Sequence, residues 1–280
     1  MKLAVINFSG NVGKTTVARH LLLPRMPSAE LITVESVNAN GDTGDGPSNN
    51  PNGPSTPSLR GRQFAALQEY LQTIDSAVVD IGASNVEELL NLMQLYRGSH
   101  EDFDCFIVPT VPALKQQQDT IATLIALSRL GVPPQRVKLV FNMVEATHSV
   151  DETFYLLLAF LAERPIATVN TACCIGANEI YARIRGLRGA EADLATLASD
   201  GTDYKALILQ SRDTTEKLAL AQKLATCRLA SWVVPEHDAC FAALGLADPL
   251  APLSDSAQVS TLTALVAAAP ASRGAKRAAP

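Results

Sequence analysis

The stretch LAVINFSGNVGKTTVARHLLL, residues 3–23, decides which fold the rest of the chain can build. It begins with the apolar run LAVINF, which has the length and composition of a buried strand. It ends with TTVARHLLL, which has the pattern of a helix, and a turn containing two glycines lies between them. Strand, glycine-containing turn and helix in this order are typical of the first unit of a parallel α/β sheet.

The turn also has the composition of a phosphate-binding loop. Backbone N–H groups of such a turn converge on a phosphate, and the following helix adds its positive N-terminal end. Gly10 and Gly13 permit the bend and the close approach, Lys14 would reach the β- and γ-phosphates, and Thr15 would offer its hydroxyl to Mg²⁺. In the full pattern GxxxxGK(S/T), the first glycine is replaced here by Phe8. The predicted phosphate-binding residues are Ser9, Gly10, Asn11, Val12, Gly13, Lys14, Thr15 and Thr16.

Apolar runs of strand length recur along the chain and alternate with helical patterns. The predicted strands are residues 2–8, 30–36, 76–82, 103–110, 136–144 and 165–170. The helices predicted between them are residues 15–23, 58–74, 86–98 and 117–131, the last closed by Gly131. Most of the strands are almost continuously apolar, as strands with helices on both faces must be. We therefore predict an α/β fold of the P-loop NTPase kind, a mostly parallel sheet with helices on both faces.

The remaining segments suggest how the chain is organised. Residues 38–57 are almost wholly Asn, Gly, Asp, Pro, Ser and Thr, which predicts a mobile loop. Residues 171–270 are expected to form a helix-rich C-terminal part, with helical patterns over 178–198, 202–234 and 236–246. The small, basic tail 271–280 is expected to be disordered. We expect residues 1–280 to form a single domain.

Composition excludes several classes of protein. The net charge of −5 and pI near 5.4 argue against a surface that binds nucleic acid by bulk charge, so any DNA contact is expected to be weak or indirect. No apolar run reaches the roughly 20 residues that span a bilayer, so a membrane partner is not expected. The five cysteines form no CxxC pair and fit a reducing cytosol, which favours a cytoplasmic location.

The motif SGNVGKTT resembles the deviant Walker A box of the ParA/MinD ATPases, KGGxGK(S/T)T, whose first lysine reaches the partner's nucleotide across a dimer. In this chain Ser9 replaces that lysine and Asn11 replaces the second glycine. The segment VVDIGAS, residues 78–84, is similar to the family's Walker B segment, and KLVFNMV, residues 138–144, resembles its adenine-binding strand. The resemblance implies that Asp80 holds Mg²⁺, directly or through water, and that Asn142 recognises the adenine. It covers about residues 1–145.

The family's switch I aspartate has a counterpart at the end of the second predicted strand, where Glu35 would position the attacking water or the metal. The resemblance therefore implies Lys14, Glu35 and Asp80 as catalytic residues and ATP and Mg²⁺ as cofactors. The layout is also similar to StbB-type plasmid stability proteins. These resemblances imply a nucleotide-dependent homodimer that acts with a DNA-binding plasmid protein in plasmid stability, partition or conjugative transfer.

The serine at position 9 leaves the activity open. Loss of the signature lysine removes charge stabilisation worth several kcal/mol in comparable roles, so slow hydrolysis is expected unless Lys115, Arg60 or Arg62 substitutes. One alternative is a nucleotide-binding adaptor that does not hydrolyse ATP and docks a DNA-binding partner. A less favoured one is a small-molecule kinase on the same type of loop. Asn142 alone does not exclude guanine, so ATP and GTP both remain candidates.

Overall fold

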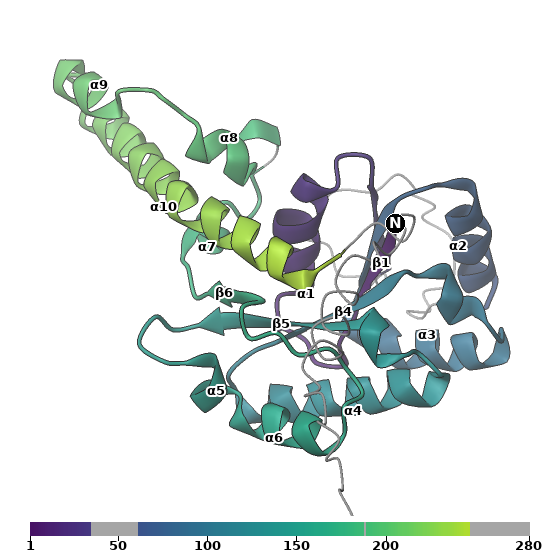
Figure 1. Ribbon diagram of the computed structural model, residues 1–280. Coiled ribbons are helices and arrows are strands. Elements are labelled where there is room, and N and C mark those ends of the chain that lie inside the picture. Colours follow the sequence, from purple (N-terminus) through teal and green to yellow (C-terminus); the bar gives the residue numbers. More distant parts are fainter. Residues whose placement is uncertain (35–60, 188, 247–280) are drawn as a thin grey trace, which may run out of the picture. The chain divides into compact units, whose positions relative to one another are not determined.

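The computed structural model describes residues 1–34, 61–187 and 189–246, which form a parallel sheet with helices packed against it (Figure 1). The sheet has six strands in the order β2-β3-β1-β4-β5-β6, and every neighbouring pair is parallel. The strands are β1 (Lys2–Val5), β2 (Glu30–Val34), β3 (Ala77–Ile81), β4 (Cys105–Thr110), β5 (Val137–Val144) and β6 (Cys174–Gly176). The predicted α/β class with a parallel sheet is confirmed.

The strand order places β1 at the centre of the sheet. It pairs with β3 on one side and with β4 on the other, so the chain crosses over β1 between β3 and β4. In open α/β sheets, ligands bind outside the carboxyl ends of the strands at such a reversal. The loop that follows β1 therefore begins where this fold class places its binding site.

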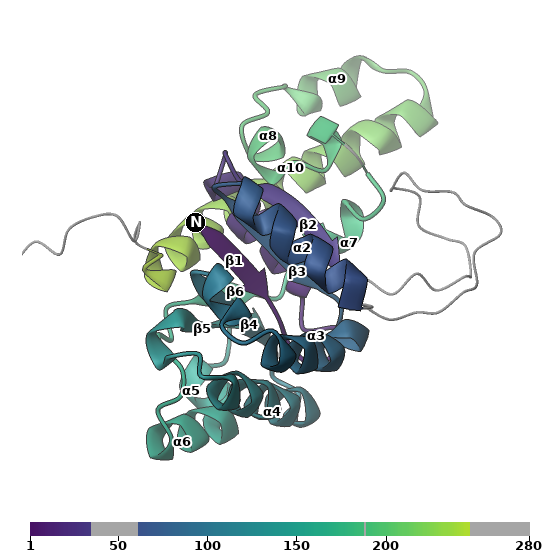
Figure 2. The same ribbon diagram turned by 90° about the vertical axis from the view of Figure 1, so that its right-hand side faces the viewer.

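One face of the sheet is covered by helices α2 to α6 (Figure 2). Their bounds are α2 (Gly61–Thr73), α3 (Ala83–Leu95), α4 (Leu114–Leu130), α5 (Val150–Thr153) and α6 (Tyr155–Glu163). Strand residues such as Ala4, Val79 and Phe106 belong to the core on this side. Helix α4 ends where predicted, because Gly131 has a φ of 94° and its N–H bonds to the carbonyl of Ser128.

The opposite face is covered by the helix that follows β1 and by the end of α10 (Thr214–Leu244). Leu3, Val5 and Val78, which alternate with the residues of the first core, pack here. The predicted helix 15–23 is not uniform: it consists of α1 (Lys14–Thr16), the π-helical η1 (Val17–Leu22) and the 3₁₀ turn η2 (Leu23–Arg25). Both faces of the sheet are thus covered by helices, as the continuously apolar strands require.

The sixth predicted strand was wrong in its position. Within 165–170 the structure has only an isolated bridge, between Lys138 and Thr168. The chain then turns at Asn170, whose side-chain oxygen accepts from the N–H of Ala172, and re-enters the sheet as β6. An Asn that bonds to backbone two residues ahead stabilises a turn at the expense of strand pairing. The pairing strand is therefore the shorter segment CIG.

The described C-terminal residues contain several helices, but the breaks between them fall elsewhere than predicted. Beside α10 they include α7 (Ile180–Arg183), α8 (Leu194–Ala198) and α9 (Tyr204–Gln210), which share an apolar cluster with α10. The predicted helix 202–234 is interrupted between α9 and α10, where the Asp213 carboxylate accepts from two N–H groups and caps α10. Helix α10 then continues through Pro235, where the sequence predicted a break. Packing of the helix on both sides of the proline outweighs the hydrogen bond that the proline removes.

Some predictions concern residues outside those that the structure describes. These are the loop 38–57, Glu35, the tail 271–280 and the end of the helix-rich part beyond residue 246. In the described residues, no helix has the length and apolar character needed to cross a bilayer.

Candidate functional site

The loop between β1 and α1 lies at the carboxyl end of the central strand. Its last residue, Gly13, accepts the first helical hydrogen bond from the N–H of Val17, at 2.8 Å. Strand β3, paired directly with β1, brings Asp80 to the same edge through the register Val5–Asp80. The sheet therefore joins the two parts of the chain that the sequence assigned to phosphate and magnesium binding.

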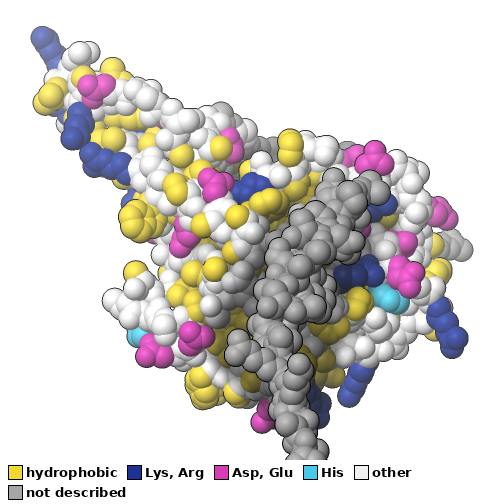
Figure 3. Space-filling view, viewed as in Figure 1, with side chains coloured by type: hydrophobic (Ala, Val, Ile, Leu, Met, Phe, Trp, Pro, Cys, Tyr) yellow, Lys and Arg dark blue, Asp and Glu magenta, His cyan; other side chains and the backbone are white. Residues whose placement is uncertain are grey.

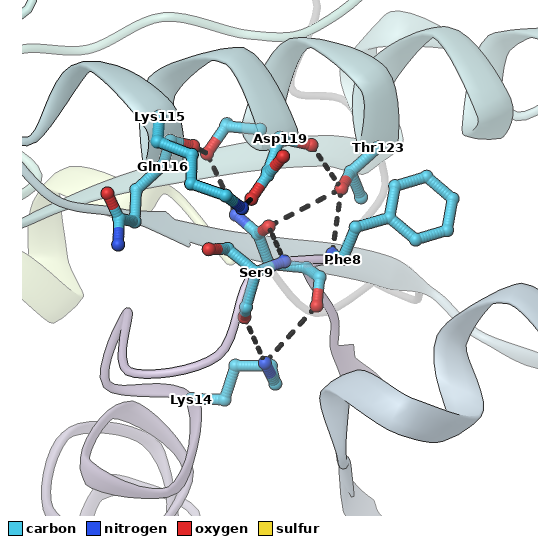
Figure 4. A network of polar contacts seen from close by, with 9 residues as sticks. Phe8, Ser9, Lys14, Lys115, Gln116, Asp119 and Thr123 are labelled. Atoms are coloured by element: carbon cyan, nitrogen blue, oxygen red, sulfur yellow. Dashed lines mark hydrogen bonds and ion pairs between the residues drawn. The ribbon is translucent and has the colours of Figure 1, made fainter.

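The first half of the loop is held by buried polar side chains. The Asn7 side chain, fully buried, accepts from the N–H of Ser9 at 2.8 Å and donates to the Pro109 carbonyl and the Thr120 hydroxyl, each at 2.8 Å. The hydroxyl of Thr123 on α4 accepts from the N–H of Phe8 at 3.0 Å (Figure 4). Buried polar groups with partners on every side fix one geometry, because leaving any of them unpaired is costly. These bonds fix where the loop begins.

The second half of the loop is held from β5. The buried Asn142 amide donates to the carbonyl of Val12 at 3.0 Å, and its oxygen accepts from the N–H of Met143 at 2.9 Å. Gly13 has a φ of +83°, and a Cβ built on it would lie 2.1 Å from the amide nitrogen of Asn142. Glycine is therefore required at position 13 both by its left-handed backbone and by this contact.

Lys14 begins α1 and is largely buried. Its ammonium donates to the carbonyl of Ser9 at 2.7 Å and to that of Asn7 at 3.2 Å, so it lies inside the curve of the loop (Figure 4). Burial lowers the pKa of Lys14 to about 8, and the nearby Asp80 carboxylate opposes that shift. A desolvated cation enclosed by backbone is well placed to meet the oxygens of a phosphate.

Thr15 and Asp80 form the other charged part of the site. The Thr15 hydroxyl donates to the Asp80 carboxylate at 2.7 Å. Burial raises the pKa of the Asp80 carboxyl, while the bond from Thr15 and the Lys14 charge lower it. A hydroxyl and a carboxylate that converge in this way suit Mg²⁺, which takes few protein oxygens and completes its shell with water and phosphate. No group of three or more His, Cys, Asp or Glu side chains that could hold a metal ion occurs among the described residues.

The remaining predicted loop residues differ in what they contact. Gly10 and Asn11 are exposed, and Asn11 has a φ of 58°, which asparagine tolerates better than most residues. Nothing lies within 4 Å of a Cβ built on Gly10, so the protein itself does not require glycine there. Val12 is fully buried, and Thr16 is partly buried at the start of the helix. The eight predicted phosphate-binding residues thus form the turn and the first residues of the helix that follows it, α1.

Ser9, in the place of the signature lysine, is only 5% exposed. Its side chain lies beside Asp119 of α4, which also pairs with Lys115 at 2.8 Å (Figure 4). The Lys115 ammonium, and after it the Ser9 hydroxyl, hold the pKa of the Asp119 carboxyl below its ordinary value. Lys115 is one of the cations that could replace the signature lysine. It is linked to Ser9 through the carboxylate of Asp119, which contacts both residues. Arg60 and the side chain of Arg62 are not among the described parts of the structure.

Sequence reasoning missed the residues that support the loop. Asn7, Thr120 and Thr123 were treated as part of a strand and of a helix face. An Asn within the otherwise apolar run LAVINF is unusual, so Asn7 is the sequence signal that points to them. Glu35 lies just beyond the described end of β2, where Val34 pairs with Ile81.

No protein-family model and no curated protein sequence matches the chain. Among solved structures, it is similar to an ATP complex of McdA from Cyanothece, with 15% identity, a TM-score of 0.41, and coverage of 80% of this chain and 96% of that one. It is also similar to the MinD cell division protein of Aquifex aeolicus, with 14% identity, a TM-score of 0.44, and coverage of 81% of this chain and 95% of that one. A third similar structure is that of a putative plasmid partition protein of Borrelia burgdorferi B31 bound to AMPPNP, with 10% identity, a TM-score of 0.37, and coverage of 80% of this chain and 96% of that one. At such low identities, the roles of residues in this chain must be derived from its own geometry.

Replacing Gly13 by alanine tests the contact between the loop and β5. We expect Gly13→Ala to lower the free energy of unfolding by at least about 1–2 kcal/mol, because alanine is strained at this φ and its Cβ displaces the Asn142 amide. Urea denaturation measures the change. The matched control is Gly10→Ala in the same loop, which should change stability by less than about 0.5 kcal/mol. Equal stability of the two variants would contradict the described loop geometry.

The lowered pKa of Lys14 predicts how anion binding depends on pH. With a pKa of about 8, the lysine is charged below this pH and loses its proton above it, so affinity for a triphosphate should be nearly constant below about pH 8 and fall above it. The fall is at most about tenfold per pH unit, and it continues up to the higher pKa that Lys14 has when the anion is bound. Titration calorimetry across this range measures it. Lys14→Ala should bind weakly and lack the fall; the same pH dependence in both proteins would exclude Lys14 as its source.

Proposed function

We propose that the chain is an ATP-dependent switch that acts in plasmid stability or partition and in conjugative transfer, with slow Mg²⁺-dependent hydrolysis. ATP would bind at residues 9–16, and contacts to its γ-phosphate would set the conformation of the segments that follow β2 and β3. The biological setting is supported by the sequence resemblance to ParA/MinD-type and StbB-type proteins.

One observation carries the nucleotide-binding part of the proposal. Lys14, Thr15 and Asp80 converge at the start of α1, joined by a bond of 2.7 Å between Thr15 and Asp80 and by the charge interaction of Asp80 with Lys14. A buried lysine, a hydroxyl and a buried carboxylate beside a glycine turn match the needs of a phosphate and its magnesium ion. A purely structural role does not explain why both charges are kept in a buried place.

The roles of the residues follow from their positions. The loop N–H groups and Lys14 would bind the β- and γ-phosphates, while Thr15 and Asp80 would hold Mg²⁺, which offsets phosphate charge. Glu35 would orient the attacking water, as the acid after the strand that pairs with β3. Asn142 would recognise the base. Because its amide also donates to the carbonyl of Val12, it would hold the loop at the same time.

The proposed partners are a second copy of the chain, formed when nucleotide is bound, and a DNA-binding plasmid protein. Figure 3 shows Lys and Arg side chains along α9 and α10, at the upper left of the view, with acidic side chains among them. Lys205, Arg212 and Lys217 alternate there with Asp203 and other acids. Such mixed charge suits a contact with a protein, or a weak contact with DNA, better than strong binding of DNA.

A specific observation favours a second candidate, an adaptor that binds ATP without turnover. Position 9 holds an uncharged, buried serine beside the ion pair of Asp119 and Lys115, where the ATPases that the motif resembles have a lysine. Loss of a cation at this place weakens stabilisation of the charge that develops on the phosphates. Lys115, paired with Asp119, is the described cation best placed to compensate.

Phosphate release from ATP is the measurement that tests the proposal. We expect the wild-type protein to release phosphate slowly and only when Mg²⁺ is present. Double-stranded DNA or lysate of a plasmid-bearing host should raise the rate of release. Lys14→Ala should abolish both nucleotide binding and release, because the phosphates lose their buried cation. Asp80→Asn should bind nucleotide but lose its dependence on Mg²⁺. Adding GTP as a competitor shows which base is preferred.

The outcomes separate the candidates. Nucleotide binding that depends on Lys14 without any phosphate release would favour the adaptor. Transfer of phosphate to a small acceptor in place of water would indicate a kinase. An absence of nucleotide binding by the folded wild-type protein would overturn the proposal.

Restoring the signature lysine is a separate prediction. We expect Ser9→Lys to raise the rate of phosphate release at least about tenfold, because it supplies one cation to the phosphates. The matched control is Ser9→Ala, which removes the hydroxyl without adding charge and should leave the rate low. Equal rates for Ser9→Lys and wild type at saturating partner would show that position 9 does not limit hydrolysis.

A further inference from the structure

Three short helices and the first part of α10 share an apolar core that is separate from the cores of the sheet. We call this part of the chain, residues 178–234, the helical lobe; Figure 1 shows α8 and α9 lying along α10. No strand residue belongs to its core, whose buried members among the described residues are Ile180, Ile184, Leu194, Leu197, Tyr204, Cys227, Ala230 and Val233. A part of a chain that has its own core can move as one body, because few apolar contacts break when it turns.

Helix α10 passes from the helical lobe to the sheet at Pro235. Before the proline, Ala230 and Val233 belong to the core of the lobe. After it, Cys240 and Leu244 belong to the core on the face of the sheet that α10 covers. A proline inside a helix removes one of the hydrogen bonds of the helix and favours bending there. The weakest point of α10 therefore lies between two cores.

The lobe has a second connection to the sheet, which lies beside the first. The chain enters the lobe shortly after β6, and Gly176 at the end of β6 donates its N–H to the carboxylate of Glu236 at 2.8 Å. Glu236 directly follows Pro235, so the two connections are in contact with each other. A body that is joined to another at two adjacent points can turn about them, which is the geometry of a hinge.

One arginine binds α10 on both sides of the proline. Arg25 of η2, which belongs to the sheet side, donates to the carbonyl of Val234 at 3.2 Å, just before the proline. The same guanidinium pairs with the carboxylate of Asp238, beyond the proline, at 2.6 Å. Arginine suits this place because its planar group presents five N–H donors in fixed directions. Arg25 therefore restrains α10 across its weakest point.

A second contact across the hinge joins Tyr181 of α7 to His237, which is only 1% exposed. The Tyr181 hydroxyl lies 2.7 Å from Nε2 of His237, and Nδ1 lies 3.0 Å from the carbonyl of His20. Because a carbonyl only accepts, Nδ1 carries the proton. Burial lowers the pKa of His237 to about 4, so the ring is neutral at neutral pH and Nε2 accepts from the tyrosine. His237 thus bonds to η1 and to the lobe at once.

We infer that the helical lobe is hinged to the sheet at Pro235. Arg25 and the pair of Tyr181 and His237 form a lock that holds the lobe in place. When the lock opens, the lobe turns as a unit and its own core stays intact. The inference does not depend on the proposed function, because none of these residues belongs to the phosphate loop.

The structure also offers a simpler explanation, namely that these contacts only stabilise a rigid chain. Their loss would then lower the free energy of unfolding without changing the distance between the lobe and the sheet. A hinge predicts the opposite pattern, in which the distance changes while the protein stays folded. Distance is therefore the measurement that separates the two explanations.

Electron paramagnetic resonance measures this distance in the full chain. Spin labels are attached to ketone-bearing amino acids at positions 95 on α3 and 209 on α9, where the native leucines are 77% and 84% exposed. We expect one narrow distribution of distances in the wild-type protein. Arg25→Lys combined with Tyr181→Phe removes the planar group and the hydroxyl of the lock. Each lost hydrogen bond should raise the ratio of open to closed lobes about two- to tenfold, which broadens the distribution or adds a second distance.

Two further variants test the place of the hinge and the specificity of the lock. Pro235→Ala restores a helical N–H, so adding it to the unlocked protein should narrow the distribution again. The matched control is Tyr70→Phe, which removes a tyrosine hydrogen bond of 2.6 Å to Glu30, outside the lock, and should leave the distances unchanged. Urea denaturation confirms that each variant is folded. If the double variant is not, the two single variants take its place.

Each other outcome overturns the inference. An unchanged distribution in the unlocked protein would mean that the lobe and the sheet form one rigid body. Broadening that Pro235→Ala does not reduce would place the flexible point elsewhere in the chain. Equal broadening in Tyr70→Phe would show a general loosening of the protein and not the opening of a lock.

Discussion

The site depends on hydrogen bonds that hold the loop after β1 from both sides. Asn7 and Thr123 hold its first half, and Asn142 bonds to its second half at Val12. A turn of glycines and small residues has little side-chain packing of its own, so its shape must be imposed by its neighbours. Asn7 is held in turn by the Pro109 carbonyl of β4, while Thr123 belongs to α4 and Asn142 to β5. The loop therefore takes this shape only when the sheet has formed in its observed order.

That constraint also explains how two opposite charges come to be buried together. The pairing of β1 with β3 brings Asp80 to the start of α1, where Thr15 bonds to it. Burial lowers the pKa of Lys14, and the carbonyl groups of Ser9 and Asn7 accept hydrogen bonds from its ammonium. The contacts that shape this site come from the protein itself, and preformed sites lose less free energy to ordering on binding.

The helix that follows the loop is tied to the C-terminal part of the chain. Arg25 donates to the carbonyls of His20 and Leu21 at the end of η1, and it pairs with Asp238 of α10 at 2.6 Å. The side chain of His237 contacts the same His20 carbonyl at 3.0 Å. These contacts join the helix that follows the glycine turn to α10 at His237 and Asp238, so the two elements pack as one unit there.

The sequence by itself determined the α/β class, the glycine turn and helix start at residues 9–16 and the acid at the end of β3, because these depend on local composition and on periods of apolar residues. It placed the sixth strand wrongly and divided α10 at Pro235, because strand pairing and helix packing override local signals. Only the tertiary structure showed that Asn7 supports the loop, that Ser9 lies against Asp119 and that Pro235 lies between two apolar cores. These features join residues far apart in the chain, and their contacts are decided by which strands are neighbours in the sheet.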